Sequence, residues 1–325
     1  MIHFQLVEPQ NLRELTAFLA KINGSSMPLA GGTDLMTLVK DGILRPEVVV
    51  DLSPLLELRG IRKDQAGVRI GALTTIKELA ADLVIEKNFP GLRQAALSIG
   101  SPQLRNVGTV GGNLCQRPRC WYFRDPLFNC RKKGGSRCFA AKGRNKYHAI
   151  FGGGICHIVH PSDLAPALIS LEAKVKMLSP GGEREMPLEN FFALPSVSVR
   201  QENILQLGEI LTEVTIPFPP PRRKSIYLKF TERGSWDFAV VSVAASGIVE
   251  GRRIIKPRVI LGGVAPIPWR LQGFESRIDG RELKEAAVAA AAFEALEEAR
   301  PLEENRYKVD LAGVWLTRAV LSLLT

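Results

Sequence analysis

All five cysteines of this 325-residue chain lie within one segment, between residues 115 and 156. The interval from Arg117 to Lys146 holds ten Lys or Arg residues and one acid, Asp125, so it carries a net charge of +9 while the whole chain carries +10. Cysteines that cluster in one part of a large chain are more typical of metal ligation than of a disulfide framework. A segment of about forty residues without helical or strand periodicity also favours ligation, because a metal would order it.

The spacing of the cysteines leaves three interpretations open. The pattern Cys-x4-Cys-x9-Cys-x7-Cys-x17-Cys lacks the close C-x2-C pairs of zinc ribbons and bacterial ferredoxins. The thiols could be free and partly buried, they could bind zinc together with His148, His157 or His160, or four of them could hold an iron–sulfur cluster. We favour a [4Fe-4S] cluster, because its thiolates bring negative charge that the surrounding cations stabilise.

Five cysteines are one more than such a cluster binds. Cys115 directly follows Gly-Gly-Asn-Leu, which we assign to the scaffold rather than to the insert, and it is therefore left out. The predicted ligands are Cys120, Cys130, Cys138 and Cys156.

Composition restricts the class of protein. Apolar residues make up 46% and charged residues 23% of the chain, as in a soluble globular protein. The chain has no run of about eighteen apolar residues, so no membrane span is expected, and its first residues do not form a secretory signal. The positive charge allows a rival from another class, a zinc-stabilised protein that binds nucleic acid through the basic interval. That rival leaves the glycine motifs of the chain unexplained.

Two glycine-rich turns precede the insert. The first, Gly31-Gly32-Thr33-Asp34, follows a short apolar strand at residues 27–30 and precedes a helix, so free backbone N–H groups lie at the positive end of that helix. The second covers residues 108–113. Either turn alone would also suit an ordinary tight connection. Together they could line two sides of an elongated anion such as a pyrophosphate.

The chain divides at two proline-containing stretches. Ser53-Pro54 is a candidate boundary between subdomains, and the interval 217–224, with four prolines and three basic residues, is a candidate linker. We therefore expect a domain at 1–219, with lobes at about 1–55 and 56–219 and the insert at 115–158. A separate C-terminal α+β domain is expected at 220–325.

Six motifs, two of which contain the glycine-rich turns, are spread over essentially the whole chain. They are Ala-Gly-Gly-Thr-Asp-Leu at 30–35, Ile-Gly-Ala-Leu-Thr at 70–74, Thr-Val-Gly-Gly-Asn at 109–113, Ser-Asp-Leu-Ala at 162–165, Lys229 with Arg233 and Asp237-Phe238-Ala239, and Leu-Gly-Gly-Val-Ala-Pro at 261–266. In this order they resemble the FAD-binding medium subunit of the xanthine dehydrogenase, or molybdenum hydroxylase, family.

The insert narrows the resemblance. It is similar to the insert of flavin subunits that carry an extra [4Fe-4S] cluster in periplasmic aldehyde oxidoreductases, and a related insert occurs in 4-hydroxybenzoyl-CoA reductase. The sequence Arg-Cys-x-Tyr-Phe-Arg-Asp at 119–125 and the sequence His-Pro-x-Asp at 160–163 favour the aldehyde oxidoreductase type.

The resemblance implies an α+β fold, with a two-lobed FAD-binding domain of the medium-subunit (PCMH-like) type before the C-terminal α+β domain. Thr33 would cap the helix behind the first loop, and Asp163 would bond ribityl or ribose hydroxyls. Leu211 would pack on the isoalloxazine ring, and Lys229 would lie near the polar edge of that ring. The implied FAD-binding residues are Leu29, Ala30, Gly31, Gly32, Thr33, Asp34, Leu35, Thr109, Gly112, Asn113, Asp163, Leu211 and Lys229.

The resemblance also implies a function. The chain would be an oxidoreductase subunit that passes electrons from [2Fe-2S] centres of a small partner subunit through FAD to an external acceptor, while a large partner subunit with a molybdenum cofactor oxidises an aldehyde. No molybdenum site and no catalytic residue of its own is expected in this chain, since the chemistry belongs to the cofactors. The alternative is the flavin subunit of a 4-hydroxybenzoyl-CoA reductase-like complex. The complex would be a heterotrimer or its dimer, cytoplasmic by default and periplasmic if a partner carries the export signal.

Overall fold

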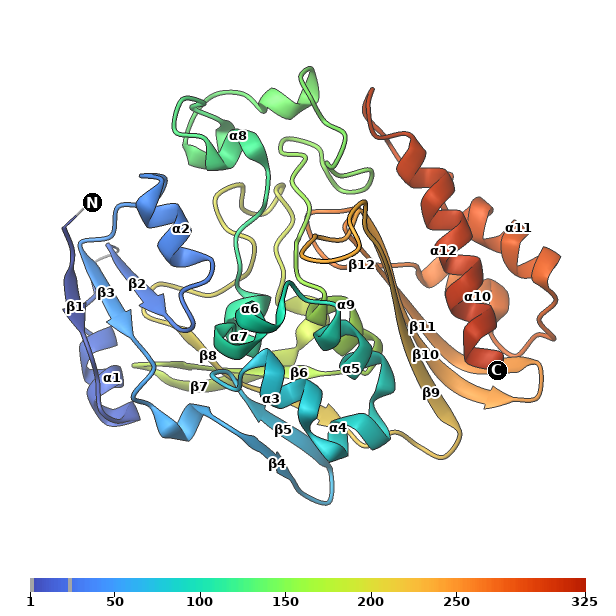
Figure 1. Ribbon diagram of the computed structural model, residues 1–325, viewed down its shortest axis with the longest axis horizontal. Coiled ribbons are helices and arrows are strands. Elements are labelled where there is room, and N and C mark those ends of the chain that lie inside the picture. Colours follow the sequence, from blue (N-terminus) through green and yellow to red (C-terminus); the bar gives the residue numbers. More distant parts are fainter. Residues whose placement is uncertain (1–2, 23–24) are drawn as a thin grey trace.

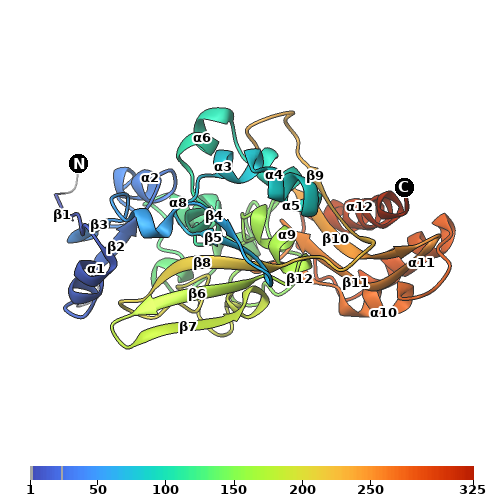
Figure 2. The same ribbon diagram turned by 90° about the horizontal axis from the view of Figure 1, so that it is seen from below.

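The computed structural model describes residues 3–22 and 25–325 of the chain. Within them three β-sheets follow one another across the molecule, and helices pack around and between them (Figures 1 and 2). One sheet is parallel and two are antiparallel, which confirms the predicted α+β class. No helix in the described part of the chain is long and apolar enough to cross a membrane.

The N-terminal sheet is small and parallel, with the strand order β1-β3-β2. Helix α1 packs its apolar face on it through the buried Leu15 and Leu19. The side chain of Asn11 caps this helix by accepting a hydrogen bond from the backbone N–H of Glu14 at 2.9 Å. The elements of this lobe are β1 (Gln5–Val7), α1 (Leu12–Leu19), β2 (Ser26–Leu29), α2 (Leu35–Lys40) and β3 (Val48–Asp51).

The central sheet is antiparallel, with the strand order β4-β5-β8-β6-β7. Its strands come from both sides of the cysteine-rich insert, so the chain leaves this unit and returns to it. The strands are β4 (Ile61–Lys63), β5 (Gly67–Gly71), β6 (Lys174–Ser179), β7 (Gly182–Pro187) and β8 (Ile210–Pro217). The helices that accompany them are α3 (Ile76–Ala81), α4 (Leu83–Asn88), α5 (Pro90–Leu97), α6 (Pro102–Val107), α7 (Val110–Leu114) and α9 (Leu164–Ser170).

The C-terminal sheet is antiparallel, with the strand order β12-β11-β10-β9. Helix α12 packs on strands β9 and β10 through Ala312, Leu316 and Val320, which lie four residues apart and are fully buried. The elements are β9 (Arg223–Phe230), β10 (Val241–Glu250), β11 (Arg253–Gly262), β12 (Trp269–Arg270), α10 (Gln272–Ile278), α11 (Glu285–Ala295) and α12 (Tyr307–Leu324).

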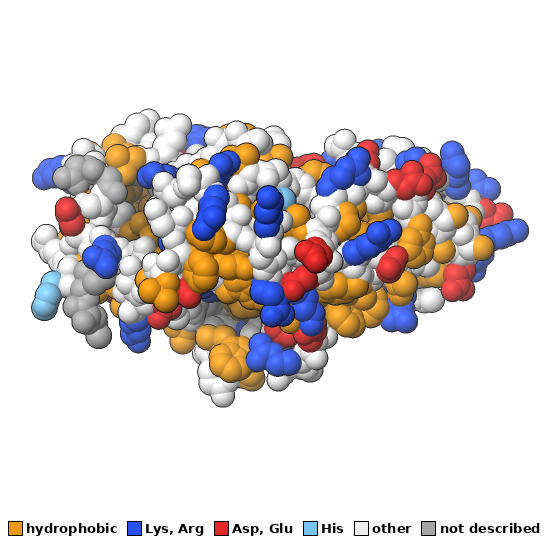
Figure 3. Space-filling view, turned by 90° about the horizontal axis from the view of Figure 1, so that it is seen from above, with side chains coloured by type: hydrophobic (Ala, Val, Ile, Leu, Met, Phe, Trp, Pro, Cys, Tyr) orange, Lys and Arg blue, Asp and Glu red, His pale blue; other side chains and the backbone are white. Residues whose placement is uncertain are grey.

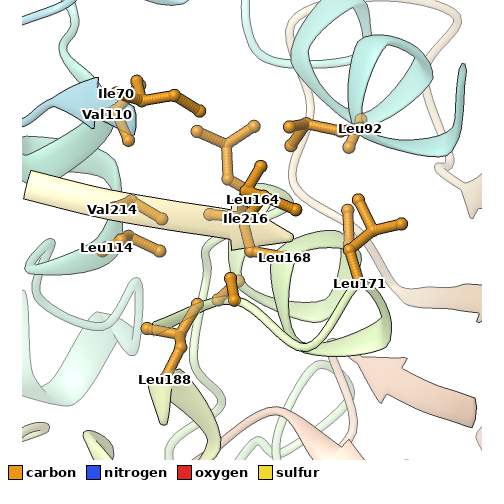
Figure 4. Packing of buried hydrophobic residues seen from close by; sticks show 14 of the residues in the cluster. Ile70, Leu92, Val110, Leu114, Leu164, Leu168, Leu171, Leu188, Val214 and Ile216 are labelled. Carbon is orange, nitrogen blue, oxygen red and sulfur yellow. The ribbon is translucent and has the colours of Figure 1, made fainter. Parts of the chain in front are cut away.

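Helix α9 joins the central and C-terminal sheets. All of its residues are buried, and it contacts α5 and α7 on one side and β9, β10 and β11 on the other. In Figure 4 the side chains of Leu164 and Leu168 lie among those of Leu92, Val214 and Ile216. A helix that is apolar on every side is typical of a protein core. The helix therefore fixes the position of the chain segment that precedes it, residues 160–163.

The insert has little regular structure, but both of its ends are anchored. Its one short α-helix, α8 (Trp121–Arg124), buries Phe123 against Leu38 of α2. Near the other end, the ammonium group of Lys308, which is fully buried in α12, donates to the carbonyl oxygens of Tyr147 at 2.9 Å and of Gly263 at 2.7 Å. Burial lowers the pKa of Lys308 to about 7. The insert thus bridges the N-terminal lobe and the C-terminal sheet, as Figure 1 shows.

The burial of α9 leads to a stability prediction. Replacement Leu168→Ala should lower the free energy of unfolding by about 2–5 kcal/mol, because it leaves a cavity between two sheets. Leu83→Ala is the control, since that side chain is 77% exposed and its loss should change stability by less than about 0.5 kcal/mol. Urea unfolding followed by circular dichroism measures both variants. Equal stability of the two variants would contradict the central role of α9.

Candidate functional site

A cavity of about 600 Å³ lies where the N-terminal lobe, the central sheet and the loop at 233–238 meet. Its volume is in the range of pockets that hold small molecules and cofactors. Most of the side chains and loops predicted to bind FAD line it. They are Ala30, Gly31, Gly32, Thr33, Asp34, Leu35, Thr109, Gly112, Asn113, Asp163 and Leu211. Leu29 and Lys229 lie outside this lining.

The first glycine loop packs closely against the chain segment that precedes the second glycine loop. A Cβ atom on Gly31 would lie 2.0 Å from the carbonyl oxygen of Val107, so the two backbones can approach only with glycine at this position. Gly32 has a φ of +70°, which also favours glycine. Both glycines are therefore required by the local backbone, and their N–H groups belong to a wall of the cavity.

Helix α2 follows this loop, and its capping differs from the prediction. The residue at its N-cap is Asp34, not Thr33, and no side chain makes a capping hydrogen bond. The expectation that Thr33 caps the helix was wrong. The carboxylate of Asp34 instead binds the insert: one oxygen accepts from Arg119 at 2.6 Å and from Arg124 at 2.5 Å, and the other accepts from the backbone N–H of Arg117 at 2.7 Å.

The second glycine loop is held by its own side chains. The hydroxyl of Thr109 caps α7 by accepting from the N–H of Gly112 at 3.1 Å. The side-chain oxygen of Asn113 accepts from the hydroxyl of Ser162 at 2.6 Å. This hydrogen bond connects the loop to the segment that leads into α9, so the two walls of the cavity are positioned together.

Asp163 is the buried acid of the cavity. Its two carboxylate oxygens accept hydrogen bonds from the hydroxyl of Tyr227 at 2.6 Å and from the ammonium group of Lys229 at 2.8 Å. Burial raises the pKa of Asp163, and the nearby Lys229 opposes that shift. Lys229 also donates to the carbonyl oxygen of Ser98 at 3.1 Å. Lys229 therefore contacts Asp163 from outside the cavity lining. Its position near the flavin ring stays a prediction.

Two basic residues of the insert that line the cavity were missed from the sequence. Arg117 and Arg119 line the cavity together with the glycine loops. They follow the second loop by only a few residues, and Arg119 directly precedes Cys120. Their position between two recognised motifs could have indicated a role in the cavity. The many other basic residues of the insert gave no reason to single them out.

A second, smaller cavity lies inside the insert. All four predicted cluster ligands line it, together with the fully enclosed Lys132 and several aromatic side chains. The four are Cys120, Cys130, Cys138 and Cys156. Cys115 lines the first cavity instead, which agrees with its omission from the predicted ligands.

Burial and mutual contact perturb these thiols. Burial raises the pKa of Cys120 to about 12. A hydrogen bond between the Cys138 and Cys156 side chains lowers the pKa of Cys138 to about 5 and raises that of Cys156. Because metal ligation requires thiolates, binding of a metal centre here would release protons.

Of the histidines considered as zinc ligands, His148 lies beside the cysteines and His160 lies outside their cavity. His148 lines the cysteine cavity, with its Nε2 atom 3.2 Å from the sulfur of Cys120. His160 is buried against the ring of Phe192. In residues 3–22 and 25–325, no group of three or more His, Cys, Asp or Glu side chains is arranged to hold a single metal ion.

Most of the insert's cations are paired with acids of the surrounding protein. The pairs are Arg117 and Lys132 with Glu202, Arg119 and Arg124 with Asp34, Arg144 with Glu304, and Lys146 with Glu232. Figure 3 shows the molecule from above, the side on which Figure 1 draws the insert. On this face Lys and Arg side chains are interspersed with hydrophobic and acidic ones. This arrangement disfavours a continuous basic surface for nucleic acid.

Comparison with known proteins agrees with the geometry of the cavity. Residues 2–219 match the family model of the FAD binding domain in molybdopterin dehydrogenase, and residues 226–323 match that of the CO dehydrogenase flavoprotein C-terminal domain. The chain is 38% identical over 296 residues to the aldehyde oxidoreductase FAD-binding subunit PaoB of Escherichia coli, covering 87% of each chain. It is 29% identical to the carbon monoxide dehydrogenase medium chain of Hydrogenophaga pseudoflava, over 98% of this chain and 96% of that one.

The fold of the chain is similar to that of solved structures of related proteins. The carbon monoxide dehydrogenase of Hydrogenophaga pseudoflava, solved without the Mo-pyranopterin moiety of its cofactor, contains a chain that superposes with a TM-score of 0.79 at 25% sequence identity, with full coverage of both chains. The predicted two-part fold, a FAD-binding domain followed by a C-terminal domain, is confirmed. The chain belongs to the family of FAD-binding medium subunits of the molybdenum hydroxylases and is an oxidoreductase component.

Proposed function

We propose that this chain is the FAD- and [4Fe-4S]-binding electron-transfer subunit of a molybdenum-cofactor aldehyde oxidoreductase. In this role it passes electrons from [2Fe-2S] centres of a partner through FAD to an external acceptor. The observation that carries the proposal is the pair of cavities: one is lined by the FAD-binding loops, and the other by four cysteines of a single insert.

The residues around the first cavity fit FAD. The loops at 30–35 and 109–113 form two of its walls, and backbone N–H groups near a helix start suit a pyrophosphate. Asp163 presents a carboxylate to the same space, and Leu211 adds an apolar surface that is 6% exposed. When bound, FAD supplies the exchange between two-electron and one-electron transfer, and the chain holds it and excludes water.

The donor set of the second cavity fits an iron–sulfur cluster. Four thiols line one buried space of about 10 Å³, and four cysteine ligands are what a [4Fe-4S] cluster needs, so binding would require the thiols to move apart. The buried ammonium group of Lys132 lines the same space and offsets the negative charge of thiolates. Lys132 is itself held by Glu202 and by the carbonyl oxygen of Val199 at 2.9 Å.

The aldehyde substrate of the complex is proposed from the 38% identical relative, whose name describes an aldehyde oxidoreductase subunit. A 4-hydroxybenzoyl-CoA reductase-like complex is the alternative, based on the insert alone. We assign substrate oxidation to a large partner subunit with a molybdenum cofactor and the first electron transfer to a small [2Fe-2S] partner subunit, in a heterotrimer or its dimer. Location in the cytoplasm is the default, and export with a signal-bearing partner would place the complex in the periplasm.

The cluster assignment predicts a selective loss of iron. Cys130→Ser should remove most of about four irons per chain and leave FAD bound, because Cys130 lines only the cysteine cavity. Cys115→Ser is the matched control for iron and should keep it, because Cys115 does not line the cysteine cavity. Iron, zinc and released flavin are measured on the same anaerobically purified complex. Zinc without iron in the unmodified protein would exclude the cluster, and iron loss in Cys115→Ser instead would change the ligand set.

The assignment of the first cavity to FAD predicts that adding one methyl group at Gly31 strongly weakens FAD binding. Gly31→Ala should weaken FAD binding by about tenfold or more, because the added Cβ forces the first loop away from Val107. Gly181→Ala is the control, since its Cβ would meet only the Ser179 hydroxyl at 3.6 Å and Gly181 does not line the cavity. Titration of FAD into the flavin-stripped complex, followed by flavin fluorescence, gives both dissociation constants. Equal constants would contradict the loop assignment.

A further inference from the structure

Arg119 occupies an unusual position between the two cavities. Its side chain lines the flavin cavity, while the next residue, Cys120, lines the cysteine cavity. Its guanidinium group lies 4.7 Å from the centre of the Phe238 ring, which also lines the flavin cavity. The stacking and the hydrogen bond to Asp34 fix the orientation of the guanidinium group.

The charge around the first glycine loop is not balanced within the protein. Asp34 carries one negative charge and is bound by two guanidinium groups, those of Arg119 and Arg124. Because these three side chains are largely buried, one positive charge remains in excess beside the loop at 30–35. Residues 30–35 themselves line the cavity.

The other charged groups of the cavity do not cancel this excess, because each acid among them is paired with another cation and Arg117 shares Glu202 with Lys132. Asp163 binds Lys229, Glu209 binds Arg184, Asp237 binds Arg233, and Arg117 binds Glu202.

Arg119 also has unused hydrogen-bonding capacity. Its Nη1 atom donates to Asp34 and its Nη2 atom donates to Gln116 at 3.0 Å, while its Nε–H is buried and has no partner. A guanidinium group has five N–H donors, so Nη1 and Nη2 each keep a second N–H that can serve a ligand in the cavity. A guanidinium group matches phosphate oxygens in both charge and geometry.

We propose that Arg119 donates hydrogen bonds to the pyrophosphate of bound FAD, so that the cysteine-rich insert completes the flavin site. This inference rests on the proposed binding of FAD in the first cavity. The two negative charges of the pyrophosphate then face the N–H groups of the first loop on one side and the excess cation of the insert on the other. Arg124 neutralises Asp34 and thereby keeps the acid from repelling the phosphates.

The chain offers a closely matched control for Arg119, namely Arg137. Each of the two arginines directly precedes a predicted cluster ligand, Cys120 or Cys138, and each stacks on a phenylalanine ring. The guanidinium group of Arg137 lies 4.5 Å from the centre of the Phe139 ring, away from the flavin cavity. Both glutamine variants remove one positive charge from the insert, and only Arg119→Gln removes it from the flavin site.

The test is the dissociation constant of FAD in the complete complex, measured by titration after the flavin has been removed. Arg119→Gln should raise this constant by about tenfold or more, as expected for loss of a hydrogen bond to a charged group, and Arg137→Gln should leave it unchanged. Arg119→Lys keeps the charge and should recover part of the affinity. Iron content and thermal unfolding, measured on each variant, show whether the insert remains folded.

Three outcomes would overturn the inference. Unchanged FAD affinity in Arg119→Gln would show that the side chain does not bind the cofactor. An equal loss in Arg137→Gln would show that only the general charge of the insert matters. An equal loss in Arg124→Gln, with no recovery in Arg119→Lys, would show that Arg119 acts by positioning Asp34. Absence of FAD from the unmodified complex would instead overturn the proposed function, so the two failures are distinguishable.

Discussion

A largely buried carboxylate, shared by two guanidinium groups, holds the first glycine loop and the insert together. Asp34 follows the glycine pair directly, and its oxygens accept from Arg119, Arg124 and the backbone N–H of Arg117. Loss of either guanidinium partner would leave the buried acid less compensated, which is costly in a poorly hydrated site. The loop geometry therefore depends on the insert being in place. The same engagement explains why α2 begins without a side-chain cap.

The insert is ordered by long-range anchors rather than by regular secondary structure. One anchor is Asp34, a second is the buried Glu202, which pairs with Arg117 and Lys132, and the third is Lys308 in α12. Each anchor satisfies polar groups of an irregular segment that could not otherwise be buried without cost. Because these anchors lie on different sides of the insert, they bring cysteines that are far apart in the sequence to a single cavity.

Local patterns in the sequence were sufficient for the glycine loops and the family fold, and the cluster ligands stay a prediction. The glycines follow from backbone requirements that act over a few residues, as the close approach of Gly31 to Val107 illustrates. The partners of Asp34 could not be predicted, because Arg119 and Arg124 are separated from it by 85 and 90 residues. Ten cations in one interval gave no basis for choosing between them, so the capping role expected of Thr33 was wrong and Arg119 was missed.

The positive charge of the insert is best understood as structural. Six of its cations pair with four acids, Asp34, Glu202, Glu232 and Glu304, so the internal pairs leave a positive excess even after they form. Part of that excess, at Arg119 and Lys132, lies beside the two cavities. A pyrophosphate and a thiolate-bound cluster are both anionic, and each would be neutralised where it binds. The pairs with acids of the surrounding protein, together with the proposed anionic cofactors, account for the charge of the insert without nucleic acid.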